Sequence, residues 1–238
     1  MKAVTGISIE TSGRKGSVAL GVGEQIIAER TFPTDREHAR ELLPTLEGLC
    51  REYNRPPDTI EHCYLSIGPG SFTGLRVAVA FARHFALAVG AKLCAVPTLD
   101  VIAENARDAD DVPADLAVLL DAKRGQVFAA VFKLDARGYR RVVEPRMIAP
   151  AQLLAEAPRG VAVVGEGIAY HRQAVEDGGA RPLDSALWWP RAASVYRLGR
   201  QIAAEGAFTD PQELVPLYLR RPEAEEVWEK RHGIDRPT

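Results

Sequence analysis

The chain has 238 residues, of which 46% are hydrophobic and 26% charged, a composition typical of a globular protein with one or two domains. Its formal net charge is -2 at pH 7, which excludes nucleic-acid binding driven by an overall positive charge. The three cysteines are far apart in the sequence and form no C-x-x-C pair, which excludes a disulfide framework or a cysteine-type zinc site.

The N-terminal residues and the apolar segments give no sign of membrane insertion. Residues 1–9 lack the basic flank and the continuous apolar run of a secretory signal. The longest apolar segment, 77–89, is interrupted by Arg83 and His84, so we expect no segment apolar enough to span a membrane. These features predict a cytoplasmic protein with no membrane partner.

The first elements in chain order are three short strands. Residues 4–9, 17–22 and 25–32 carry strand signals and are separated by glycine-containing turns, which predicts an antiparallel meander. A helix follows from Thr34 to about Tyr53, and Thr34 and Glu37 have the spacing of a capping box at its start. Pro44 lies past the first turn and is expected to kink or restart this helix.

A buried strand at 63–67 leads into a glycine-rich turn at 68–74, a helix at 72–89 and a strand at 93–96. Three hairpin strands followed by helix, strand, helix and strand is the element order of an RNase-H-like half. Two such halves form the actin-like ATPase (ASKHA) fold. We therefore predict an α/β protein with two domains of this type, the second smaller or degenerate.

The second half repeats the same theme less clearly. Its expected elements are a helix from Thr98, strands at 116–120, 126–134 and 139–143, a helix near Ala151, a strand at 161–164 and a helix at 192–204. The predicted domains are 1–98, which carries the interaction helices, then 99–206, then an extended C-terminal tail at 207–238.

The glycine-rich turn can be interpreted in two ways. Its glycines allow close backbone approach, and free N–H groups at a helix start attract anions, which would suit a phosphate. The Walker lysine is missing and the spacing differs from the dinucleotide fingerprint, so we favour a structural turn and keep phosphate contact as the alternative. The residues concerned are Gly68, Gly70, Ser71, Thr73 and Gly74.

The helix that follows the turn is apolar on more than one side. Leu75, Val79 and Ala82 belong to one apolar face, while Ala80 and its neighbours continue the apolar character around the helix. One interpretation is a helix buried inside its own domain. The other, which we favour, is a helix that packs on its sheet by one face and on another subunit by the other.

Polar residues at the first hairpin suggest a degenerate nucleotide site. Glu10, Thr11 and Ser12 stand where actin-like ATPases hold an acidic residue and hydroxyls near phosphate and metal, although a strand end with ordinary turn chemistry explains them equally well. The five histidines form no H-x-x-x-H pair, so no metal ligand is predicted, and no residue is assigned a catalytic role.

Several segments together resemble the TsaB (YeaZ) family. The densest match lies in the first hundred residues, and the 68–76 string is the most specific. The segments are 9–12 (IETS), 17–20 (SVAL), 38–44 (HARELLP), 68–76 (GPGSFTGLR), 96–99 (VPTL), 121–128 (DAKRGQVF) and 216–220 (PLYLR).

The resemblance implies a subunit of the bacterial machinery that attaches a threonylcarbamoyl group to adenosine in tRNA. It implies pairing with a TsaD-like catalytic paralogue through the two helices of the first domain, homodimers when that partner is absent, a TsaE-like ATPase as a further partner, and tRNA contact through the complex. The expected interface residues are Leu42, Leu43, Leu46, Arg76, Val79, Ala80 and Arg83.

This chain departs from the catalytic paralogue in one respect. The paralogue carries an H-x-x-x-H metal pair after the V-P segment, where this chain has Thr98 and Ile102. We therefore expect a non-catalytic scaffold that requires no cofactor, with ATP or ADP at a subunit seam as a secondary interpretation. The alternative function is an independent small actin-like ATPase or kinase that uses Glu10, Thr11, Ser12 and the glycine turn.

Overall fold

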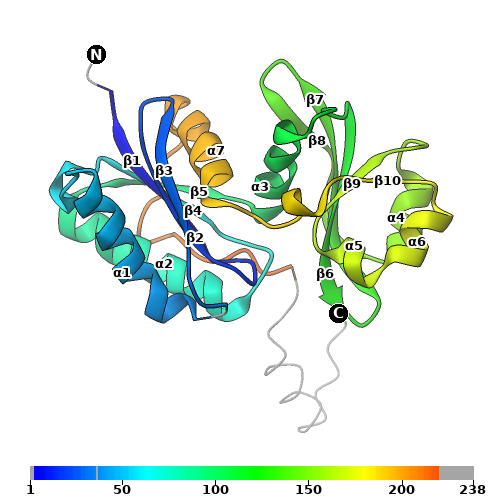
Figure 1. Cartoon of the computed structure of the whole chain (residues 1–238), viewed down its shortest axis with the longest axis horizontal. Helices are drawn as coiled ribbons and strands as arrows, with labels where there is room; N and C mark the ends of the chain where they lie inside the picture. The colour runs from blue at the N-terminus through cyan, green and yellow to red at the C-terminus, as the bar shows by residue number, and fades with distance from the viewer. Residues whose placement is uncertain (1–2, 36, 220–238) are drawn as a thin grey trace, which may run out of the picture.

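The computed structural model describes residues 3–35 and 37–219 and contains two five-stranded mixed sheets side by side (Figure 1). The first sheet has the order β3-β2-β1-β4-β5. Strands β1, β2 and β3 form an antiparallel meander, and β4 and β5 run parallel to β1. Their bounds are β1 (Thr5–Glu10), β2 (Ser17–Val22), β3 (Gln25–Thr31), β4 (His62–Ser66) and β5 (Lys92–Val96).

Helices cover both faces of the first sheet. Alternate side chains of β1, such as Ile7 and Ile9, pack with α1 (His38–Glu52) and α2 (Phe72–Val89). On the opposite face, β4 contributes Tyr64 to a core shared with α7 (Ala192–Ala204). In Figure 1 the pair α1 and α2 lies on one side of this sheet and α7 on the other. The first domain therefore has three layers.

The start of α1 differs from the expected one. The helix begins at His38, and Glu37 takes the N-cap position without a side-chain capping hydrogen bond, so the predicted capping box of Thr34 and Glu37 is wrong. Pro44 lies inside one continuous helical segment that extends to Glu52. The first turn of α1 is held instead by His38, whose ring nitrogen Nε2 lies 3.0 Å from the carbonyl oxygen of Gly13.

The second sheet repeats the strand order of the first as β10-β9-β6-β7-β8. Helix α3 packs on one of its faces, and three shorter helices pack on the other. The strands are β6 (Asp115–Lys123), β7 (Gln126–Asp135), β8 (Gly138–Ile148), β9 (Ala162–Val164) and β10 (Arg181–Pro182). The helices are α3 (Thr98–Asn105), α4 (Pro150–Glu156), α5 (Gly167–Tyr170) and α6 (Arg172–Asp177), with 3-10 turns at Pro57–Thr59, Ala106–Asp108 and Ser185–Leu187.

Helices α3 and α7 pack together between the two sheets. Buried Asn105 ties them: its Nδ2 donates to the carbonyl oxygens of Leu187 and Trp189, at 3.0 and 2.7 Å, and its Oδ1 accepts from the Ser194 hydroxyl at 2.7 Å. Because α7 packs on the first sheet, the expected second domain at 99–206 contains a helix whose core contacts belong to the first domain.

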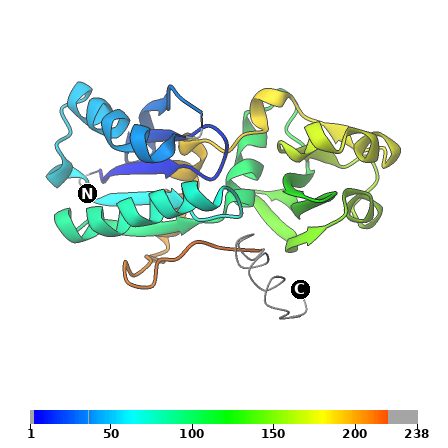
Figure 2. The same cartoon turned by 90° about the horizontal axis from the view of Figure 1, so that it is seen from below.

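Residues 207–219 return along the first sheet, and the remainder of the expected tail, 220–238, lies outside the described residues. Thr209 forms an antiparallel bridge with Leu93 of β5, and Leu214 is buried in the same core cluster as α1 and α2. The described part of the tail is therefore packed against the domain. Figure 2 shows it crossing beneath the first domain beside α2.

Helix α2 is the one helix in the described ranges that is long and apolar enough to cross a membrane, judged by length and composition alone. Its mean hydropathy over 18 residues is 1.4, so the expectation that no segment meets such criteria is wrong for 72–89. Leu75, Ala78 and Ala82 of this helix are fully buried against the sheet. A core helix satisfies the same criteria, and the packing of α2 is that of a core helix on one face.

Candidate functional site

The glycine-rich turn packs directly on the first hairpin. The backbone N–H of Ser71 donates to the carbonyl oxygen of Ser12 at 2.7 Å, and the Thr11 hydroxyl donates to the carbonyl oxygen of Gly74 at 2.8 Å. A Cβ on Gly74 would lie 1.9 Å from the Thr11 carbonyl oxygen, and one on Gly70 would lie 2.5 Å from that of Ser12. These glycines are therefore required for close approach of two backbone segments.

Hydrogen bonds within the chain hold the glycine-rich turn and the start of α2 in place. The Ser71 hydroxyl caps the helix by accepting from the N–H of Gly74 at 3.2 Å. The N–H of Gly68 donates to the Thr98 hydroxyl at 3.1 Å, and Gly68 adopts a φ of 118° beside the carbonyl oxygen of Leu217. Thr73 is exposed. This geometry supports the structural interpretation of the turn.

Glu10 lies at the carboxyl end of β1 and is completely buried. Its Oε1 accepts from both the backbone N–H and the hydroxyl of Ser12, each at 2.5 Å. Its Oε2 has no hydrogen-bond partner of ordinary geometry among the residues that the structure describes, although the Ser66 hydroxyl lies close enough to lower the pKa of Glu10. Burial raises the pKa of Glu10, against the opposing effect of the hydrogen bonds from Ser12. Glu10 therefore acts here as an acceptor that holds Ser12 under the glycine turn.

The raised pKa of Glu10 predicts a pH-dependent stability. The folded chain binds the Glu10 proton more tightly than the unfolded chain, so stability falls as pH rises from the ordinary carboxyl pKa through the folded-state pKa. Glu10→Gln keeps the Oε1 acceptor and removes the charge. We expect this variant to melt at a higher temperature than the unmodified chain at about pH 8, with a smaller difference at about pH 5.

Thermal melts across this pH range measure the effect. Glu47→Gln is the matched control, because Glu47 is an exposed residue of α1 and its loss should give similar shifts at every pH. An unmodified chain that is more stable than the Glu10→Gln variant at about pH 8 would contradict the burial argument.

Three of the expected interface residues lie in the core instead. The side chains of Leu42, Leu46 and Val79 are 2%, 4% and 7% exposed and pack between the helices and the first sheet. A partner could not reach them without repacking the domain, so their assignment to an interface is corrected. The face of each helix that carries these residues packs against the first sheet.

The remaining expected residues do lie on the outside. Leu43 on α1 is 60% exposed, Arg76 and Ala80 on α2 are exposed, and Arg83 is half-buried. Leu87, one further α2 residue that the sequence did not single out, is 75% exposed. We call these five residues the outer face of α1 and α2. Two large aliphatic side chains, Leu43 and Leu87, are therefore exposed to solvent on the outer face.

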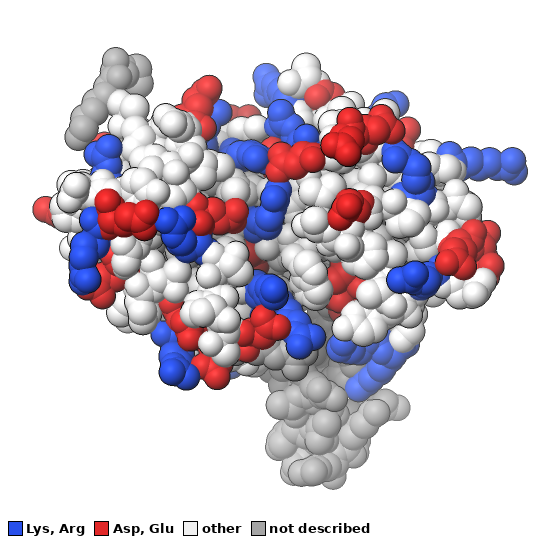
Figure 3. Space-filling view, in the orientation of Figure 1, with Lys and Arg blue, Asp and Glu red and all other residues white. Residues whose placement is uncertain are grey.

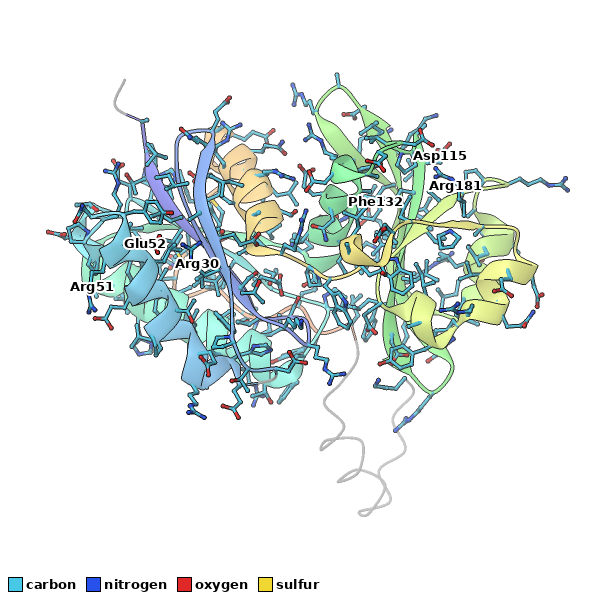
Figure 4. All side chains as sticks on the ribbon, in the orientation of Figure 1. Arg30, Arg51, Glu52, Asp115, Phe132 and Arg181 are labelled. Carbon is cyan, nitrogen blue, oxygen red and sulfur yellow. The ribbon has the colours of Figure 1, made fainter. Side chains whose placement is uncertain are left out.

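An ion pair joins the end of α1 to the edge strand of the sheet. Arg30 of β3 donates to both carboxylate oxygens of Glu52, at 2.9 and 3.0 Å, and Figure 4 shows the two side chains meeting beside Arg51. Both partners are about half exposed, so the pair orients the helix end more than it stabilises the fold.

Sequence reasoning missed two residues that contact Arg76. Its guanidinium carbon lies 3.7 Å from the centre of the Phe72 ring, and its Nε donates to the Tyr218 hydroxyl at 3.3 Å. Phe72 and Tyr218 belong to the strings 68–76 and 216–220, but nothing in either string indicates that the two segments meet.

Two hollows occur in the second domain, far along the chain from the glycine turn. Both include Asp111 and Arg181, and Figure 4 places Arg181 and Asp115 together at that end of the molecule. Within residues 3–35 and 37–219, no three histidine, cysteine or acidic side chains are grouped as metal ligands would be. On the face drawn in Figure 3, acidic and basic residues are interspersed.

Comparison with known proteins gives consistent matches over most of the chain. Residues 25–228 match the model of a family described as TsaD, tRNA N6-adenosine threonylcarbamoyltransferase. The tRNA threonylcarbamoyladenosine biosynthesis protein TsaB of Bacillus subtilis is 29% identical, over 94% of this chain and 98% of that protein. TsaB of Escherichia coli is 26% identical, over 95% and 98%.

A solved structure agrees with the sequence matches. A Pseudomonas aeruginosa protein described as similar to the peptidase YeaZ superposes with a TM-score of 0.80 at 25% identity. The alignment covers 91% of this chain and 100% of that one. Most of this chain therefore has a counterpart of known structure.

Proposed function

Because this chain belongs to the TsaB (YeaZ) family, within the wider group that the TsaD model describes, we propose that it is an accessory subunit in the formation of threonylcarbamoyladenosine in tRNA. It acts by pairing with a TsaD-like catalytic paralogue and contributes no reacting group of its own. The observation that carries this proposal is the outer face of α1 and α2, which exposes Leu43 and Leu87 on helices that pack on the first sheet.

The outer face has the character of a pairing surface. Large apolar side chains on a firm support favour association, because their transfer from water contributes about 25 cal/mol for each Å² buried. Ala80, between Arg76 and Arg83 on α2, lets a partner helix approach closely. The same face would support a homodimer in the absence of the paralogue. A TsaE-like ATPase and tRNA would join the resulting complex.

A passive role for the degenerate nucleotide site supports the accessory function. Glu10 is sealed from solvent and Thr11 and Ser12 are engaged with the glycine turn, so the groups that would bind metal and phosphate serve packing. The chain would then need no cofactor for its own fold. ATP or ADP at a seam with the partner stays the secondary proposal, because exposed Thr73 lies at the start of α2.

Complex formation between the two purified proteins tests this proposal. The chain and its TsaD paralogue, mixed in equal amounts, should co-elute in gel filtration at a volume that neither protein shows alone. Separate elution at micromolar concentrations would contradict the proposal.

The rival function, an independent ATPase or kinase, is tested on the same preparation. Calorimetry with ATP and magnesium should give no tight binding to the chain alone, and phosphate release should stay at the level of the buffer. Tight binding with turnover in the absence of any partner would favour the rival.

A further inference from the structure

The described part of the C-terminal tail forms a strap along the first domain. We define the strap as residues 208–218. Its N-terminal part is joined to β5, where the N–H of Thr209 donates to the carbonyl oxygen of Leu93 at 2.8 Å. Leu214 anchors its middle in the core at 1% exposure, and the N–H of Leu217 donates to the carbonyl oxygen of Ile67 at 2.7 Å. The strap is therefore fixed at three points before it reaches α2.

The strap ends on the side chain of Arg76. The Tyr218 ring lies 5.2 Å from the Phe72 ring, measured between centroids, and its hydroxyl accepts from Nε of Arg76 at 3.3 Å. The Arg76 guanidinium stacks over the other aromatic partner, Phe72, at 3.7 Å. One long side chain on the outer face thus contacts two aromatic residues, the ring of Phe72 from α2 and the hydroxyl of Tyr218 from the strap.

This arrangement leaves part of the guanidinium available. Arg76 remains exposed, and its two terminal nitrogens make no hydrogen bond or ion pair with any residue in the described part of the chain. A planar guanidinium with both terminal nitrogens available is shaped for a carboxylate, which it can bind with two parallel hydrogen bonds. A phosphate can be bound in the same way; on a protein partner, the group that matches this guanidinium is an aspartate or glutamate side chain.

We propose that Tyr218 is a positioning residue, which holds Arg76 in the orientation in which it binds a carboxylate of the catalytic paralogue; this inference rests on the proposed function. A free arginine side chain loses rotamer freedom when it is immobilised in an interface, which weakens binding. In this chain the strap has already restricted Arg76. Tyr218 thereby contributes to affinity through Arg76.

A double-mutant cycle on the full chain tests the inference, with affinity for the purified TsaD paralogue measured by calorimetry. We expect Arg76→Ala and Tyr218→Ala each to weaken binding by up to about ten-fold. In the Arg76→Ala background, Tyr218→Ala should have no further effect, because it acts through Arg76. Tyr218→Phe, which keeps the ring and removes the hydroxyl, should recover part of the loss.

Tyr170→Ala is the matched control, since Tyr170 is 61% exposed on α5 in the other domain and should leave affinity unchanged. The inference would be overturned if the Tyr218→Ala chain bound with wild-type affinity. It would also be overturned if Tyr218→Ala weakened binding equally in the unmodified chain and in the Arg76→Ala chain. Neither result would contradict pairing with the paralogue. Failure of the unmodified chain to bind the paralogue would instead overturn the proposed function. Thermal melts of each variant report any general loss of folding.

Discussion

Gly74→Ala is expected to destabilise the fold by about 3 kcal/mol, because the added methyl group overpacks the contact between α2 and the backbone of the first hairpin. The added Cβ would lie 1.9 Å from the carbonyl oxygen of Thr11 and 2.9 Å from Cδ2 of His38. Alanine is a better helix former than glycine by at most about 1 kcal/mol, so the clash outweighs this gain. The hairpin and the start of α2 must separate, and the unfolding midpoint in urea should fall accordingly.

The matched control is Gly48→Ala in α1, where no heavy atom lies within 4 Å of the added Cβ. This variant receives the same benefit in helix propensity without the clash, so we expect it to be as stable as the unmodified chain or more so. Equal stability of the Gly74→Ala and Gly48→Ala chains would show that the turn and the hairpin are not in obligatory contact.

Ala80→Glu is expected to abolish pairing with the TsaD paralogue while the chain itself stays folded. Ala80 is exposed, so a glutamate there is solvated in the free chain, whereas pairing would force a larger, charged side chain out of water against the partner helix. Arg76 and Arg83, four and three residues away, would offset part of the charge but not the steric clash, so we expect a net cost of about 3 kcal/mol, a loss of affinity on the order of 100-fold. Gel filtration of the mixture should then give two separate peaks.

The control for this substitution is Ala155→Glu, which places the same charge at an exposed position of α4 in the second domain. It should leave complex formation and the melting temperature unchanged. Normal co-elution of the Ala80→Glu chain would remove the outer face of α1 and α2 from the interface, whatever the effect of the control.

Much of the first domain could be predicted from local signals. The strand at Ser17–Val22 and the helix at Phe72–Val89 have the bounds that the sequence indicated. Glycine turns delimit the strand, and Ser71 and Gly90 cap the helix at its two ends. These signals lie within a few residues of the element that they define, so they need no knowledge of the tertiary structure.

The division of residues between core and surface could not be predicted in the same way. Because α2 is apolar on more than one side, its sequence does not specify which side the sheet covers, and Val79 proved to be on the covered side. In α1, adjacent Leu42 and Leu43 point in opposite directions, one 2% and the other 60% exposed. Periodicity identifies an apolar stripe, whereas the edge of that stripe depends on packing.

Contacts between segments that are far apart in the sequence could not be predicted from local signals. Helix α7 was expected in its place along the chain, but its packing on β1 and β4 joins the end of the sequence to its beginning. The contact of Tyr218 with Arg76 spans 142 positions. No periodicity or residue spacing in either segment indicates which other segment it contacts. Such contacts are known only from the three-dimensional structure.

The central claim is that this chain is necessary for the tRNA modification and performs no chemistry alone. Reconstitution with the purified TsaD paralogue, the TsaE-like ATPase, unmodified tRNA and the activated threonylcarbamoyl donor tests it most directly, with modified adenosine measured by mass spectrometry. We predict full modification with the chain, loss of modification when it is omitted or replaced by the Ala80→Glu variant, and none from the chain alone. Undiminished modification in its absence, or modification by the chain without TsaD, would contradict the account.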